Sequence, residues 1–154
     1  RTMTHEHYLL PEDRIYAIER IHQLEVEIQD LGPEFQDVFT QSSETWHDNA
    51  PFDALRDKQS NLAAELDQLR KLVRHSTLTP PRKKRGTVGI GDTVVLASGK
   101  QYHIAGDWTH KAGHRVDNAY WVSRHTPVAQ SLLGHAAGDS VVLAGQDTMI
   151  EEII

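Results

Sequence analysis

The stretch IHQLEVEIQDLGPEFQDV, residues 21–38, carries the pattern that decides the first half of the fold. Its apolar side chains recur at steps of three and four residues, at Ile21, Leu24, Ile28, Leu31, Phe35 and Val38. This spacing is typical of the a/d seam of a coiled coil, so it predicts a long amphipathic helix. Pro33 removes a backbone donor, and we expect a bend or a short break near Gly32–Pro33 before the helix resumes in phase.

A second seam follows along the chain. It has the same spacing with one polar interruption, at Leu55, Gln59, Leu62, Leu66, Leu69 and Val73. Either helix alone would expose its apolar stripe, so two seams in one chain predict an antiparallel coiled-coil hairpin. An intermolecular dimer through the same stripes is the alternative, and we expect a monomer.

The segment TQSSETWHDNAPF, residues 40–52, must contain the reversal between the two helices. Glu44 and Asp48 then lie at the far end of the hairpin, where their carboxylates offer the oxygen ligands that a hard cation such as Mg²⁺ prefers. The alternative role for Asp48 is structural, because Asp is a preferred N-cap residue and Pro51 suits the first turn of the second helix.

The composition sets broad limits on function. The chain has 154 residues, 38% hydrophobic and 25% charged, with no cysteine and no apolar run of 18 residues, which predicts a protein of the cytoplasm without a membrane span or disulfides. Its net charge of −6 argues against a protein that coats nucleic acid. Residues 1–75 carry 15 acidic and 8 basic side chains, a net charge of −7, whereas residues 76–154 carry 7 and 8, a net charge of +1.

A change of composition marks a boundary at residues 76–86, so we expect a hairpin over 1–75, a linker over 76–86 and a second domain over 87–154. In this second domain short β-type runs predict strands at Thr93–Leu96, Gln101–Ile104, Tyr120–Val122, Val141–Leu143 and Met149–Ile154. One short helix interrupts them, with Thr126 as N-cap, Pro127 at N1 and Gly134 after its end. The fold class is therefore α+β, with a small, largely antiparallel sheet and one helix after the hairpin.

Two further patterns carry alternatives. The run Arg82-Lys83-Lys84-Arg85 is typical of a solvated linker, or else it contacts an anionic partner such as nascent RNA electrostatically. His110 and His114 have chelating spacing, as do His5 and His7, but no third ligand accompanies either pair, and we expect no structural zinc.

Three stretches in this order resemble the Gre family of bacterial transcript-cleavage factors. They are Gly32-Pro33-Glu34-Phe35, then Asp48-Asn49-Ala50, then His125-Thr126-Pro127-Val128-Ala129 through Leu132-Leu133-Gly134 and Gly138-Asp139. The third is similar to the family's Ser-Pro-Ile-Ala, Leu-Ile-Gly and Gly-Asp signature and is the most specific. The resemblance covers nearly the whole chain, from Leu10 to Ile154.

The resemblance implies that an FKBP-like second domain docks on the rim of the RNA polymerase secondary channel, through Arg124, His125, Thr126 and Pro127. The hairpin then reaches the polymerase active site, where Asp48 and Glu44 share a weakly held Mg²⁺ with the polymerase and promote hydrolysis of backtracked RNA. The resemblance also implies that no cofactor is bound tightly and that the protein is not itself an enzyme. One departure concerns the tip, because Thr45 stands where the family carries an acidic residue.

Because of Thr45, a second function stays open, in which the hairpin plugs the channel and inhibits transcription without cleavage. A third is that of an FKBP-type prolyl isomerase, which needs an apolar, aromatic-lined pocket. The aromatic side chains of the second domain are Tyr102, Trp108, Tyr120 and Trp121. The expected partner is RNA polymerase, with contact to nascent RNA or DNA in the complex and none to a membrane.

Overall fold

A computed structural model describes residues 7–42 and 50–154. The chain forms two compact units, one spanning Ile15–Arg74 and one that combines the N-terminal segment up to Arg14 with His75–Ile154. The sequence predicts a hairpin over residues 1–75, but the described residues 7–14 lie with the C-terminal unit. The N-terminal segment is held in this unit because strand β1 (His7–Tyr8) pairs in parallel with strand β2 (Ser76–Thr77).

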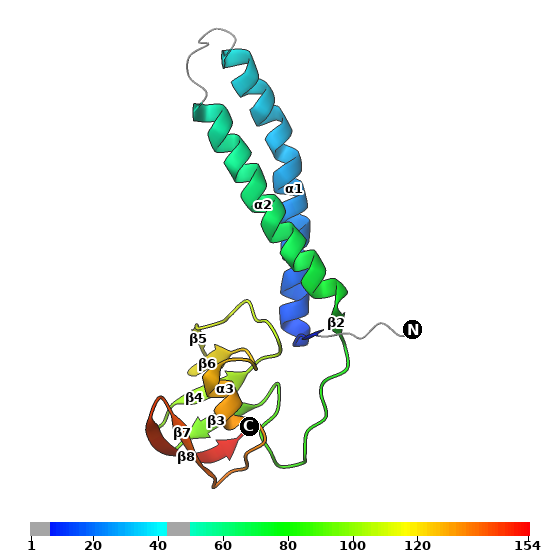
Figure 1. Cartoon of the computed structure of the whole chain (residues 1–154). Coiled ribbons are helices and arrows are strands. Elements are labelled where there is room, and N and C mark those ends of the chain that lie inside the picture. The colour runs from blue at the N-terminus through cyan, green and yellow to red at the C-terminus, as the bar shows by residue number, and fades with distance from the viewer. Residues whose placement is uncertain (1–6, 43–49) are drawn as a thin grey trace. The chain divides into compact units, whose positions relative to one another are not determined.

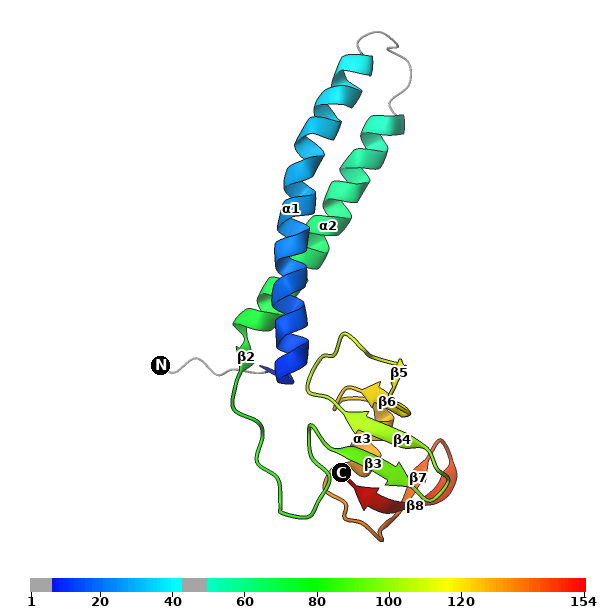
Figure 2. The same cartoon turned by 180° about the vertical axis from the view of Figure 1, so that it is seen from behind.

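Two long helices form the hairpin unit. Helix α1 (Pro11–Ser42) and helix α2 (Ala50–Arg74) lie side by side and run in opposite directions, as both views show (Figures 1 and 2). The 25 residues of α2 span about 37 Å at 1.5 Å per residue. Glu12 and Asp13 occupy the first turn of α1, where the positive end of the helix dipole stabilises their carboxylates.

The apolar seams meet as their spacing predicts. Leu24, Leu31, Leu66 and Leu69 are buried, and every other apolar seam position is at least half-buried. Gln59, the polar interruption, is exposed. The seam continues beyond the buried leucines, because the rings of Phe35 and Phe52 pack edge to face with their centroids 5.6 Å apart.

Ion pairs flank the seam on the hairpin surface. Arg20 donates from Nε and Nη2 to the two carboxylate oxygens of Glu65, at 2.8 and 3.0 Å. This hydrogen-bonded pair raises the pKa of Arg20 and lowers the pKa of Glu65. Arg70 pairs with Glu25 at 3.1 Å. Both pairs join α1 to α2, so they support the antiparallel register.

Pro33 does not break α1, which continues through it to Ser42, so the expected interruption is wrong. A proline removes the hydrogen bond to the carbonyl four residues earlier, here that of Gln29. Both Gln29 and Pro33 are exposed, so water can satisfy that carbonyl. Burial of the seam on both sides of Pro33 keeps the helix in phase.

The C-terminal unit contains a six-stranded sheet in the order β5-β6-β4-β3-β8-β7. The strands are β3 (Thr93–Leu96), β4 (Gln101–Ile104), β5 (Arg115–Val116), β6 (Ala119–Val122), β7 (Ser140–Leu143) and β8 (Gln146–Ile153). All neighbours are antiparallel except β4 and β6. The α+β class and the mostly antiparallel sheet are confirmed.

One short helix, α3 (Pro127–Leu132), packs on this sheet through Ala129 and Leu132 (Figure 1). These two side chains join a core whose other buried members are Val88, Val94, Leu96, Ile104, Val141 and Ile150. Burial of their apolar surface holds α3 against the sheet and so fixes the segment that precedes it. In the described ranges 7–42 and 50–154, no helix is both long and apolar enough to cross a membrane.

Candidate functional site

The two parts of the predicted site differ in what the structure describes. Glu44 and Asp48, the predicted cation ligands at the hairpin tip, lie outside the described residues, as does Thr45. The predicted docking residues, Arg124–Pro127, are all described, and they connect β6 to α3.

Thr126 shapes this docking segment by capping α3. Its side-chain oxygen accepts a hydrogen bond from the Ala129 N–H at 3.2 Å and donates to the Ser123 carbonyl at 2.8 Å. Pro127 occupies the first helical position, where no donor is needed, and Gly134 adopts a φ of +83° after the helix end. The expected cap is therefore confirmed, and Thr126 is committed to local structure.

A carboxylate that the sequence did not single out organises the same segment. Asp107 has a side chain only 4% exposed, and it accepts a hydrogen bond from Arg124 Nε at 2.9 Å. Its Oδ1 also contacts His125 Nε2, and its Oδ2 accepts the Tyr8 N–H at 2.6 Å. Burial alone would raise the pKa of Asp107, but the Tyr8 N–H, His125 and Arg124 together hold this pKa below its ordinary value.

The backbone beside Asp107 is fixed just as tightly. The Tyr8 carbonyl accepts the Asp107 N–H at 2.8 Å, and the Gly106 carbonyl accepts the Arg124 N–H at 3.0 Å. No residue with a side chain fits at Gly106 without a shift of the backbone, because an added Cβ would lie 2.0 Å from the Tyr8 carbonyl oxygen. Strand β1, the Gly106–Asp107 turn and the docking segment thus form one rigid cluster.

Two of the predicted docking residues remain outward-facing. The His125 side chain is 61% exposed even though its ring contacts Asp107, and Pro127 is exposed at the start of α3. The Arg124 side chain is 28% exposed, and its Nε donates a hydrogen bond to Asp107. The arrangement therefore offers a small, exposed surface whose backbone is held by the contacts around Asp107.

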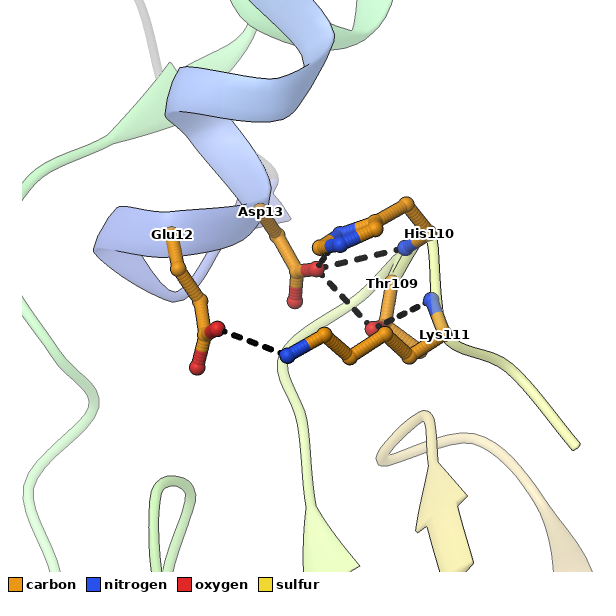
Figure 3. A network of polar contacts seen from close by, with 5 residues as sticks. All are labelled: Glu12, Asp13, Thr109, His110 and Lys111. Atoms are coloured by element: carbon orange, nitrogen blue, oxygen red, sulfur yellow. Dashed lines mark hydrogen bonds and ion pairs between the residues drawn. The ribbon is translucent and has the colours of Figure 1, made fainter. Parts of the chain in front are cut away.

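A second polar network ties the first turn of α1 to the loop after β4 within the same unit (Figure 3). Asp13, fully buried, accepts from Thr109 Oγ1 at 2.9 Å and from the His110 N–H at 3.2 Å, and His110 Nδ1 lies 2.6 Å away. Lys111 pairs with Glu12 at 3.0 Å. These contacts explain why the start of α1 belongs with the C-terminal unit.

Four of the described histidines, His22, His110, His125 and His135, contact a carboxylate in this way. His110 faces Asp13, and among residues 7–42 and 50–154 no three His, Asp or Glu side chains gather as a metal site. Asp107 and Asp13 were not predictable as site residues, because their partners lie from 17 to about a hundred positions away in the sequence. A single Asp after a strand, or in a first helical turn, carries no pattern that distinguishes it from a cap.

Sequence comparisons point to one family. The chain is 26% identical over 99 residues to the transcription elongation factor GreA of Macrococcus caseolyticus, and 27% identical over 99 residues to that of Cereibacter sphaeroides. Each match covers 61% of this chain, and the chain spans about 60% of the length of these curated relatives. No model of a known protein family matches the sequence.

Among solved structures, the crystal structure of GreA factor homolog 1 of Thermus thermophilus is 17% identical, with a TM-score of 0.43 and coverage of 96% of this chain and 97% of that one. The corresponding protein of Thermus aquaticus is 18% identical, with a TM-score of 0.39 and coverage of 97% and 98%. The sequence matches are to GreA proteins, and the motif over residues 125–139 resembles the Gre family signature, so this chain is similar in sequence to the Gre family.

Proposed function

We propose that this chain is a transcription elongation factor that binds bacterial RNA polymerase and promotes cleavage of backtracked transcripts in the cytoplasm. The observation that carries the proposal is the antiparallel hairpin of α1 and α2, in a chain whose sequence matches curated GreA proteins. The protein acts as a monomer and supplies no active site of its own. It stimulates the polymerase's hydrolysis of RNA.

Docking is assigned to the segment Arg124–Pro127. The hydrogen bonds around Asp107 and the cap at Thr126 hold this segment in one conformation before any partner arrives, which lowers the entropic cost of binding. His125 and Pro127 supply the exposed contact surface. Arg124 acts mainly by holding the segment against Asp107.

Cleavage is assigned to the hairpin tip. A two-metal hydrolysis needs ligands for a second Mg²⁺ and an oriented water. Asp48 and Glu44 are the carboxylates that would complete that coordination inside the polymerase, with the Mg²⁺ held only in the complex. Thr45, in place of the family's acidic residue, weakens the ligand set, so the rival function is a plug that inhibits synthesis without cleavage.

The prolyl isomerase alternative is poorly supported. The C-terminal unit has a cavity of about 400 Å³ beside β4 and β6, in which Trp121 is the one Trp or Tyr side chain among the described lining residues. Lys111 lies over the Trp121 ring at 4.4 Å, and Glu12, His103 and Asp117 line the same cavity. Such a charged lining is unsuited to an apolar prolyl ring.

The test is a stalled, backtracked elongation complex incubated with the protein and Mg²⁺. Shortened transcripts with a released 3′ fragment are expected, and Asp48→Ala should abolish them while polymerase binding is retained. If the intact protein slows nucleotide addition and releases no fragment, the plug function replaces cleavage.

The docking assignment needs its own variant. His125→Ala combined with Pro127→Ala should weaken polymerase binding, with His114→Ala as the matched control because His114 is also exposed. Arg124→Glu is unsuitable, since it would set a second carboxylate against the buried Asp107 and disturb the fold. Unchanged affinity of the double variant would remove the docking assignment.

A further inference from the structure

A groove in the C-terminal unit lies beside the basic run that follows β2. Its volume is about 340 Å³, which is within the range of ligand-binding pockets. One wall is Pro81–Lys84, and the other is formed by Thr87–Ile90, Arg124 and the residues after α3, Leu133–Gly134. None of these described lining residues is acidic.

The basic wall is folded against the domain instead of being a free linker. Lys83 Nζ pairs with Asp92 at 2.5 Å and donates to the Thr87 carbonyl at 3.1 Å. Its aliphatic stem lies over Gly89, where an added Cβ would come within 2.3 Å of Lys83 Cδ. The opposite wall is held by a hydrogen bond of 3.0 Å from the Gly134 N–H to the Val88 carbonyl. The groove is therefore preformed.

The other cationic side chains of the groove are not fully paired. Lys83 is neutralised by Asp92, but the exposed Arg82 and Lys84 have no acidic partner among the described side chains. Arg124 bonds Asp107 through Nε, and no described partner contacts its two terminal nitrogens. The groove is thus lined by three cationic side chains, two on one wall and Arg124 on the other, and an anionic ligand would pair with them.

Apart from Thr87, the remaining side chains that line the groove are apolar, and they distinguish between anionic ligands. Val88 is buried, and Ile90 and Leu133 are half-buried at the groove. A phosphate backbone makes no use of such a surface, and three cationic side chains neutralise few phosphates in a chain with a net charge of −6. A peptide that alternates carboxylates with an apolar side chain uses both parts of the lining.

We propose that this groove binds an acidic, extended peptide segment of a partner protein. Carboxylates of the peptide pair with Arg82, Lys84 and Arg124, and one apolar side chain sits against Ile90 and Leu133. This inference does not rest on the proposed transcriptional function, because the groove and its charges are properties of the C-terminal unit alone.

The probe is a fluorescently labelled decapeptide that repeats Asp-Glu-Leu-Asp-Glu, titrated with the full chain and followed by fluorescence anisotropy at low salt. Saturable binding is expected that weakens as salt is raised, because the pairs are partly exposed. The variant Arg82→Glu with Lys84→Glu should weaken binding by at least about tenfold through charge reversal. Arg56→Glu with Lys58→Glu, an equal charge change on exposed positions of α2, should leave it unchanged.

Two further probes complete the test. Replacing both peptide leucines with glycine should weaken binding by about tenfold if the apolar side chain is buried in the groove. A labelled ten-nucleotide oligo(U) should bind more weakly than the peptide. The proposal is overturned by absence of saturable peptide binding, by equal losses in the groove and control variants, by indifference to the leucines, or by tighter binding of the oligonucleotide.

Discussion

Asp107→Asn tests whether the buried carboxylate holds the docking cluster together. The asparagine side chain keeps one acceptor oxygen and replaces the other with an NH₂ group, which is a donor. That NH₂ group then faces another donor, either the Tyr8 N–H or Arg124 Nε, and one hydrogen bond is lost. Loss of a hydrogen bond to a charged group costs about 1.5–3 kcal/mol, and a buried donor left unpaired adds about 1–3 kcal/mol. We expect the free energy of unfolding of the C-terminal unit to fall by about 3 kcal/mol at neutral pH.

The dependence on pH gives the same experiment a second readout. The pKa of Asp107 is lowered in the folded protein, by hydrogen bonds and charge that outweigh the effect of burial. Its ionised form therefore stabilises the fold above the unfolded pKa of about 3.9, and this contribution is lost as pH falls through the lower folded pKa. The difference between wild type and Asp107→Asn should shrink below about pH 4.

The assay is urea unfolding followed by tryptophan fluorescence in a Trp46→Phe background, so that the signal comes from Trp108 and Trp121. Asp147→Asn is the matched control, because Asp147 is exposed. A loss below about 1 kcal/mol at pH 7 would refute the assignment, since even one charge-assisted bond is worth more. An equal loss at pH 7 and pH 3 would also refute it.

Three other substitutions test the packing described above. Leu24→Ala, at a fully buried seam position, should cost about 2–5 kcal/mol and lower the thermal midpoint of the helical circular dichroism signal, whereas Val26→Ala at an exposed site should not. Gly106→Ala should cost about 1–3 kcal/mol or more and increase hydrogen exchange at the Tyr8 amide, because the added Cβ meets the Tyr8 carbonyl. Thr126→Ala should lower urea stability by about 1 kcal/mol, with most of it restored by Ser at this position.

The repetitive parts of the fold were predictable because burial imposes a period on the sequence. The coiled-coil seams are confirmed in full, and β3 and β4 lie at the residues that alternation predicts. The two-residue strands β1, β2 and β5 were not predictable, because two residues carry no period. For Pro33 the local rule was overridden by packing on both sides of the proline.

The candidate site was predictable only where local chemistry repeats a known motif. The cap at Thr126 follows from three adjacent residues, so the sequence was sufficient. The roles of Asp107 and Asp13 depend on partners that lie from 17 to about a hundred positions away, and no local pattern encodes such pairing. The basic run is a third case. Its composition indicates charge, but only the fold shows that Lys83 pairs with Asp92, whereas Arg82 and Lys84 have no acidic partner among the described residues.

The placement of β1 and the first turn of α1 has a consequence for how this chain can be divided. Because the N-terminal segment up to Arg14 packs with His75–Ile154, the hairpin is topologically an insertion between two segments of one domain. A truncation that begins at Ile15 would remove β1, whose Tyr8 carbonyl lies against Gly106. It would also remove Asp13, which accepts the hydrogen bond from Thr109. Conversely, a protease that cuts among the exposed residues 78–81 would leave two fragments still joined by the Tyr8–Asp107 and Asp13–Thr109 hydrogen bonds, so excision of the hairpin requires a second cut near Arg14.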